Sequence, residues 1–235
     1  MIGSTQNLRY SRNKALRYYF PRLCEMQLSN QRIAGIILFV GAFGFILAMQ
    51  IAEFIDGAEY NVSTNYISDL GTYCTAANSV NHCVNLPSHN LFDVSVILVG
   101  VAIILGAFFL YRAFRKIVFS SLLVLSGIGA MGVGFFPENY PVEHQIFSLV
   151  VFLFGGLAAI AAYQIEVKPF NYFSIFIGAL TVTMLILFAT GQYIGLGPGG
   201  LELLVLSLGL LVLKLQFYRF ANIFLRIGPR LSALS

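Results

Sequence analysis

Long runs of apolar residues, separated by short polar segments, dominate the chain. A helix that crosses the ~30 Å hydrocarbon core of a bilayer needs about 20 consecutive apolar residues. Six runs meet this requirement, and none shows the alternation of apolar and polar residues that marks a membrane-spanning strand. They cover residues 32–54, 91–111, 117–136, 145–163, 172–190 and 201–218. The pattern therefore predicts an all-α membrane protein, a bundle of six transmembrane helices.

The composition agrees with a membrane location. Hydrophobic residues make up 58% of the 235 residues and charged residues only 10%, whereas a soluble domain carries about 25% charged residues. Because so few charges cannot cover a water-facing surface, the composition excludes a soluble enzyme, a nucleic-acid-binding module and a disordered chain. We expect the protein to lie in the plasma membrane, with membrane lipids as partners and no nucleic acid.

The distribution of basic residues predicts the orientation of the bundle. If the N-terminus is cytoplasmic and the loops alternate, all 14 lysines and arginines fall on the cytoplasmic side or at its edge. This is the positive-inside bias of membrane proteins. We therefore expect both termini in the cytoplasm, with a basic tail over residues 1–31, the membrane domain over 32–218 and a second tail over 219–235. A long outer loop, residues 55–90, follows the first helix.

The long outer loop carries two cysteines and one glycosylation motif. Eight residues separate Cys74 from Cys83. Both lie on the oxidising side of the membrane, so we expect a disulfide between them, with two free thiols as the alternative. Asn61-Val62-Ser63 matches the acceptor sequence for N-glycosylation, although three-residue matches are common by chance.

Small residues recur at helical spacing within the spans. Ser126, Ala130 and Gly134 lie four residues apart in the third span, and Gly155 and Ala159 do so in the fourth. Such rows let helix backbones approach closely. We interpret them as the packing faces of a compact bundle rather than as a slot for a cofactor, and we expect no cofactor.

The C-terminal segment predicts an amphipathic helix. Its apolar residues fall on one face and its polar residues on another, so it is expected to lie on the inner membrane interface or to pack against a partner subunit. The residues expected to face lipid or a partner are Phe217, Phe220, Phe224 and Ile227.

Polar residues concentrate at the outer end of the predicted bundle. All three histidines and eight of the ten acidic residues lie there. The candidates for a functional site are Asp69, His89, Asp93, His144 and Glu202. His89 and Asp93 are four residues apart and would share a helix face, a pair that a divalent metal can use. The alternative is ordinary helix-end chemistry, in which Asp93 and Glu202 lie near positive helix N-termini.

Recognisable reaction motifs are otherwise absent. The chain contains no zinc-binding motif and no nucleophile elbow, so we expect no metal site. The glycine-rich segment at residues 195–200 lies outside and contains no lysine. We interpret it as a flexible turn before the last span rather than as a phosphate-binding loop.

Four short segments together resemble one membrane protein family. They are residues 67–71 (ISDLG), Phe92-Asp93 with Gly100, residues 132–137 (GVGFFP) with His144, and residues 200–202 (GLE). Over roughly residues 33–215 the chain resembles the bacterial and archaeal family catalogued as domain of unknown function 998. The resemblance implies a six-helix membrane protein without a settled activity and draws attention to Asp69, Asp93, His144 and Glu202. Asp93 and Leu203 depart from the family pattern, which has Asn and Arg there.

The sequence leaves three functions open. The first is a non-catalytic accessory or structural subunit of a larger membrane complex, which the missing reaction motifs favour. The second is a membrane-embedded hydrolase or transferase acting on lipid-type substrates at the outer face, with Ser68 or Asp69 beside the histidines as the reacting groups. The third is a transporter or sensor, which the uncharged midplane and the lack of a detectable repeat disfavour.

Overall fold

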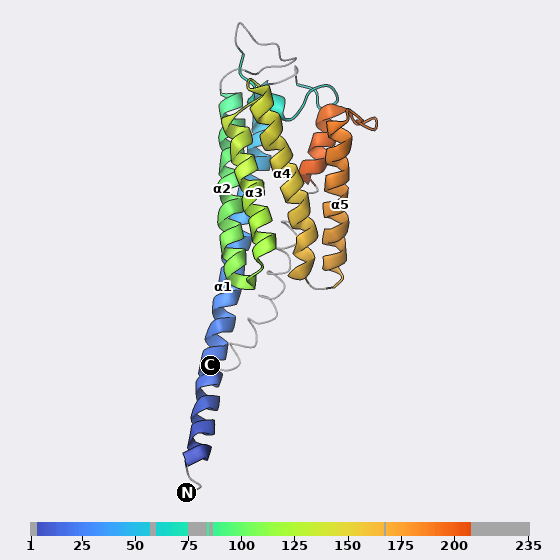
Figure 1. Cartoon of the computed structure of the whole chain (residues 1–235). Helices are drawn as coiled ribbons and strands as arrows, with labels where there is room; N and C mark the ends of the chain where they lie inside the picture. The colour runs from blue at the N-terminus through green and yellow to red at the C-terminus, as the bar shows by residue number, and fades with distance from the viewer. Residues whose placement is uncertain (1–3, 57–59, 75–83, 85–86, 167, 208–235) are drawn as a thin grey trace.

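The computed structural model describes residues 4–56, 60–74, 84, 87–166 and 168–207, with the backbone alone for residues 4–25, 27 and 28. Five long helices form a bundle (Figure 1), and two short 3₁₀ helices, η2 and η3, lie in the connections. The long helices are α1 (Ser4–Asp56), α2 (Ser88–Phe114), α3 (Ile117–Phe135), α4 (Pro141–Ala161) and α5 (Phe170–Ala189). The short ones are η2 (Ser68–Gly71) and η3 (Ala162–Gln164), and residues 197–207 form a further helical segment.

Five segments among the described residues are long and apolar enough to cross a membrane. They are Ser29–Ile55, Ser88–Phe114, Ile117–Phe135, Pro141–Gln164 and Phe170–Ala189. These segments match the first five predicted spans to within a few residues and indicate a multi-pass membrane protein. Of the sixth predicted span, residues 201–207 are helical and the remainder lies outside the described residues, so the sixth crossing stays a prediction.

The first helix is longer than its apolar run. α1 begins at Ser4, whereas hydropathy predicted a helix from Arg32. Hydropathy marks the part of a helix that lies in the membrane, and it does not mark the first residue of the helix. The helix continues through Pro21, and no glycine occurs between Ser4 and Gly35. The predicted basic tail is therefore a helical continuation of the first span, and it projects beyond the bundle (Figure 1).

Helices that follow one another in the chain pack against one another, from α1 with α2 to α4 with α5. Glycines allow the closest approaches. A Cβ atom on Gly100 of α2 would lie 2.7 Å from the carbonyl oxygen of Gly127 on α3, and one on Gly178 of α5 would lie 2.6 Å from that of Gly156 on α4. Ser126 also donates a hydrogen bond to the Val151 carbonyl oxygen across the α3–α4 contact, at 3.0 Å. The predicted close packing of small residues is thus confirmed.

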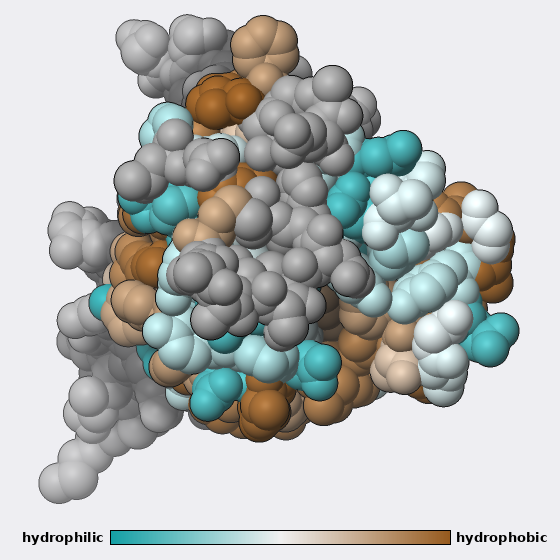
Figure 2. Space-filling view, turned by 90° about the horizontal axis from the view of Figure 1, so that it is seen from above, coloured by the Kyte–Doolittle hydropathy of each residue, from teal (hydrophilic) through white to brown (hydrophobic). Residues whose placement is uncertain are grey.

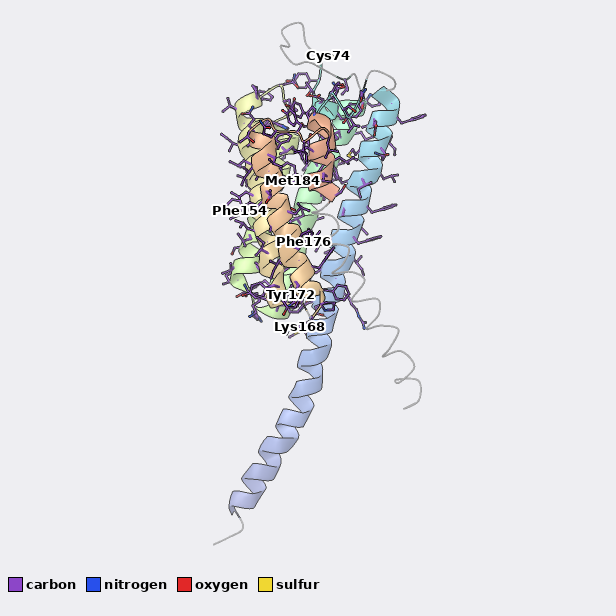
Figure 3. The ribbon with its side chains drawn as sticks, turned by 90° about the vertical axis from the view of Figure 1, so that its right-hand side faces the viewer. Cys74, Phe154, Lys168, Tyr172, Phe176 and Met184 are labelled. Atoms are coloured by element: carbon purple, nitrogen blue, oxygen red, sulfur yellow. The ribbon has the colours of Figure 1, made fainter. Side chains whose placement is uncertain are left out.

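The two ends of the bundle differ in chemistry. Cys74 lies at one end, whereas Lys168 and Tyr172 lie at the other, from which α1 projects (Figure 3). We call the Cys74 end the loop end; it consists of residues 60–73, 136–140 and 190–196. Viewed toward this end, hydrophilic residues lie on the face of the molecule and apolar residues lie around its sides (Figure 2). Which end faces the cytoplasm remains the prediction made from the basic residues.

Several sequence predictions fall on residues that the structure does not describe. Cys83 is one of them, so the Cys74–Cys83 disulfide stays a prediction. Residues 208–235 are others, and with them the proposed lipid- or partner-facing side chains of Phe217, Phe220, Phe224 and Ile227.

Replacing Gly100 with alanine should destabilise the bundle. The new Cβ atom would lie within 2.8 Å of the backbone of Gly127 and Met131, and forcing two helices apart costs about 1–3 kcal/mol. Gly44→Ala is the matched control, because a Cβ atom on Gly44 meets no other atom within 4 Å. Thermal unfolding in detergent should show a lower Tm for Gly100→Ala than for Gly44→Ala. Equal Tm values would contradict this account of the α2–α3 contact.

Candidate functional site

A short non-helical segment is buried at the loop end of the bundle. Ile67 and the four residues of η2 are each no more than about a tenth exposed. Buried backbone N–H and C=O groups must find hydrogen-bond partners, and a loop cannot provide them all by itself. The residues that supply these partners define the candidate site.

The hydrogen-bond partner that is farthest away in the sequence is Glu202. Its Oε2 accepts a hydrogen bond from the Ile67 N–H at 2.8 Å, and the Ser68 N–H donates to the same carboxyl group. Glu202 lies in the helical segment 197–207 and is itself buried. Asp69 acts locally, since its Oδ2 accepts a hydrogen bond from the Tyr66 N–H at 2.8 Å. Two of the predicted candidate residues therefore hold the backbone of the buried segment in place.

Ser68, Glu138 and His144 meet beside this segment. The Ser68 hydroxyl donates to Glu138 Oε1 at 2.5 Å, and His144 Nε2 lies 3.9 Å from the same oxygen. His144 Nδ1 lies 2.8 Å from the Phe136 carbonyl oxygen. Because a carbonyl oxygen only accepts, Nδ1 carries a proton.

We call the side chains of Ser68, Asp69, Glu138, His144 and Glu202 the cluster. Two further contacts hold the loops around it in place. The side-chain amide of Asn139 pairs with the backbone of Tyr73, donating to its carbonyl oxygen at 2.9 Å and accepting from its N–H at 3.1 Å. The hydroxyl groups of Tyr66 and Tyr193 lie 3.0 Å apart. Burial, together with this hydrogen bond, raises the pKa of Tyr66 above its ordinary value.

The second half of the glycine-rich segment, residues 197–200, packs against another loop, which the sequence interpretation as a flexible turn did not anticipate. The Gly200 N–H donates to the Val62 carbonyl oxygen at 3.1 Å. A Cβ atom on Gly197 would overlap the backbone of Ser63, and one on Gly199 would overlap the Asn65 carbonyl oxygen. These glycines therefore let the start of the helical segment lie directly against the loop that leads into η2, which brings Glu202 within reach of Ile67.

His89 and Asp93 lie next to the cluster, one turn apart in α2. A Cβ atom on Gly71 would overlap Oδ1 of Asp93, so Asp93 lies against the end of η2. The His89 ring packs against Tyr73, with ring centroids 5.8 Å apart. In the part of the chain that the structure describes, no hydrogen bond joins His89 to Asp93, and no three His, Cys, Asp or Glu side chains gather as metal ligands would.

An apolar cavity begins at Ser68 and Glu202 and runs into the bundle. Its volume is about 170 Å³. Along α2 its wall extends from Phe92 to Leu110, a rise of about 27 Å at 1.5 Å per residue. Ser68 and Glu202 line it at the loop end. The cavity therefore runs through most of the ~30 Å thickness of a hydrocarbon core.

The same small residues that pack the helices line this cavity, among them Ser126, Ala130 and Ala159. The sequence interpretation of these rows as packing faces alone was therefore incomplete. Ser126 and Thr181, two of the hydroxyl residues in the wall, donate to the carbonyl oxygens of Val151 and Ile177. Their hydroxyl hydrogens are thus occupied, and the wall remains apolar.

The hydrogen bonds of Ser68 and His144 differ from those of a Ser-His-Asp triad. In a Ser-His-Asp triad the serine hydroxyl is bonded to the histidine, which acts as its base. Here the Ser68 hydroxyl is bonded to Glu138 instead, and His144 uses Nδ1 on a backbone carbonyl oxygen. Among the described residues that line the cavity there is no lysine or arginine to stabilise an oxyanion.

Sequence reasoning missed Glu138 as a key residue. It was one of eight outer acidic residues, and nothing in its spacing distinguished it from Glu143, which lies exposed in the first turn of α4. The available signal was its place directly after Pro137, within the segment that ends at His144. Asn139 follows it and was missed for the same reason, because neither lies in a periodic element.

The family described as "Protein of unknown function (DUF998)" matches residues 37–215 of the chain. The match includes all five candidate residues, together with Ser68 and Glu138. No curated protein and no solved structure matches the chain.

Replacing Glu202 with leucine should loosen the buried segment. The change leaves the N–H groups of Ile67 and Ser68 without their acceptor, and each unsatisfied buried group costs about 1–3 kcal/mol. Glu202→Gln retains an acceptor oxygen and should lose less stability, and Glu143→Leu, at an exposed position, should lose little. Thermal unfolding and limited proteolysis of the loop end rank the three variants by stability. Equal stability of Glu202→Leu and Glu143→Leu would refute the role given to Glu202.

Proposed function

The chain belongs to the DUF998 family of proteins of unknown function, and we propose that it is a membrane protein that binds a lipid-type molecule inside its helix bundle. The chain of the bound molecule lies in the apolar cavity, and its polar head lies at the loop end beside Ser68 and Glu202. One observation carries the proposal: the cavity is apolar along its length and polar at one end, which is the chemistry of an amphiphile.

Empty space inside a folded protein is unfavourable. Protein interiors are close-packed, with few voids larger than a water molecule, and an apolar cavity stays free of water but accepts apolar ligands. A protein surrounded by lipid has hydrocarbon chains available at high concentration. A bound chain restores the dispersion contacts that the residues of the cavity wall otherwise lack.

Binding of a lipid-type molecule is compatible with more than one of the functions that the sequence leaves open. It is the first step of the lipid hydrolase or transferase alternative, and an accessory subunit can also hold a structural lipid. Catalysis is not part of the proposal, because the Ser68 hydroxyl donates to a carboxyl group rather than to His144. The subunit role, the plasma-membrane location and the cytoplasmic termini remain predictions.

Filling the cavity should remove the bound lipid. Ala130 and Ala159 line the cavity on α3 and α4, and leucine at either position would occupy the volume of the chain. Native mass spectrometry of the full chain in mild detergent should show a bound lipid-type mass that is retained by the natural protein and lost from Ala130→Leu and Ala159→Leu.

Val118→Leu is the matched control, because Val118 is exposed on the outside of α3 and leucine there leaves the cavity unchanged. Its lipid occupancy should equal that of the natural protein. Natural protein that carries no lipid after gentle purification would contradict the proposal, and so would folded alanine-to-leucine variants that retain their lipid.

A further inference from the structure

The polar end of the cavity shows which head group it fits. We infer that the bound molecule carries an uncharged or cationic head group that donates hydrogen bonds, such as a hydroxyl or an ammonium group, and not a phosphate or a carboxylate. This inference rests on the proposed function and adds the chemical class of the ligand.

Acidic side chains gather at the polar end of the cavity. Three acidic side chains meet at this end, since Glu202, Glu138 and Asp69 are all bonded to groups of residues 66–68. The sequence contains no lysine or arginine at residues 33–111, 117–167 or 169–213, the segments that supply every residue of the cluster. An anionic head group would therefore bring its charge close to Glu138 and Asp69, with no lysine or arginine in these segments to offset it, and like charges repel.

Most of the unused hydrogen-bonding groups at this end are acceptors. The donors of the cluster are already used, since the N–H groups of Ile67 and Ser68 bond to Glu202 and the Ser68 hydroxyl bonds to Glu138. Each carboxyl group retains further lone pairs, and the Ser68 oxygen can still accept. The Ser148 hydroxyl in the cavity wall can take either role. Because the unused groups of the protein mainly accept hydrogen bonds, the head group of the ligand must donate them.

The position of His144 also favours a head group that donates hydrogen bonds. His144 Nε2 lies 3.9 Å from Glu138 Oε1, and in the neutral ring with the proton on Nδ1 it is a further acceptor there. A donor head group placed between the end of the cavity and Glu138 would face acceptors from η2, from the loop before α4 and from the segment 197–207.

Three probes with the same oleoyl-type chain test the inference: monooleoylglycerol with hydroxyl groups, oleylamine with an ammonium group, and oleate with a carboxylate. Binding to the delipidated full chain in detergent is measured by native mass spectrometry, with Ala130→Leu as the background for non-specific uptake. We expect the glycerol and amine probes to bind about tenfold or more tightly than oleate.

Removing the acidic charge should reduce this selectivity. Glu138→Gln should narrow the difference between oleylamine and oleate, whereas Glu143→Gln, at an exposed position outside the cavity, should leave it unchanged.

Different results would contradict the lipid-binding proposal and the head-group inference. Oleate that binds as tightly as the other probes, with a signal that Ala130→Leu abolishes, would overturn the head-group inference and leave the lipid-binding proposal intact. Selectivity that persists in folded Glu138→Gln would also overturn it. Failure of all three probes to bind above the Ala130→Leu background would contradict the lipid-binding proposal itself.

Discussion

Two buried backbone N–H groups, those of Ile67 and Ser68, depend on the carboxyl group of Glu202. The segment that contains them is not part of a long helix, yet it lies within the end of a bundle built to cross a membrane. Backbone that leaves the helical pattern at such a place must be satisfied by other parts of the protein. Glu202 meets this requirement from a segment more than a hundred residues away along the chain, and the loop end of the structure is arranged around that contact.

The consequence is a polar cluster at the end of an apolar cavity. Because η2 is held inside the bundle rather than above it, Ser68 lies at the boundary between the two, bonded to Glu138 and lining the cavity. The small residues of α3 and α4 let the helices approach and also leave space between them, since alanine and serine at 126, 130 and 159 do not fill the centre. Close packing and the cavity therefore have the same origin in the sequence.

The sequence predicted the helices well and the site only in part. Five spans follow from apolar runs, because a membrane imposes a minimum length on each helix. Asp69, His144 and Glu202 were identified from their position at one end, but Glu138 was not, since no periodicity marks a residue in a tight loop. The packing of the glycines at 197 and 199 against the loop before η2 could not be predicted, because it depends on two segments far apart in sequence.

The central claim is that a lipid-type molecule occupies the cavity with its polar head at Ser68 and Glu202. An experimental structure of the full chain, determined after gentle extraction from its own membrane, tests this most directly. The account predicts a continuous elongated density between α2, α3 and α4 that belongs to no residue of the chain and ends beside Glu202. A cavity filled by side chains of the protein, or an empty one at a resolution that shows ordered lipid elsewhere, would contradict it.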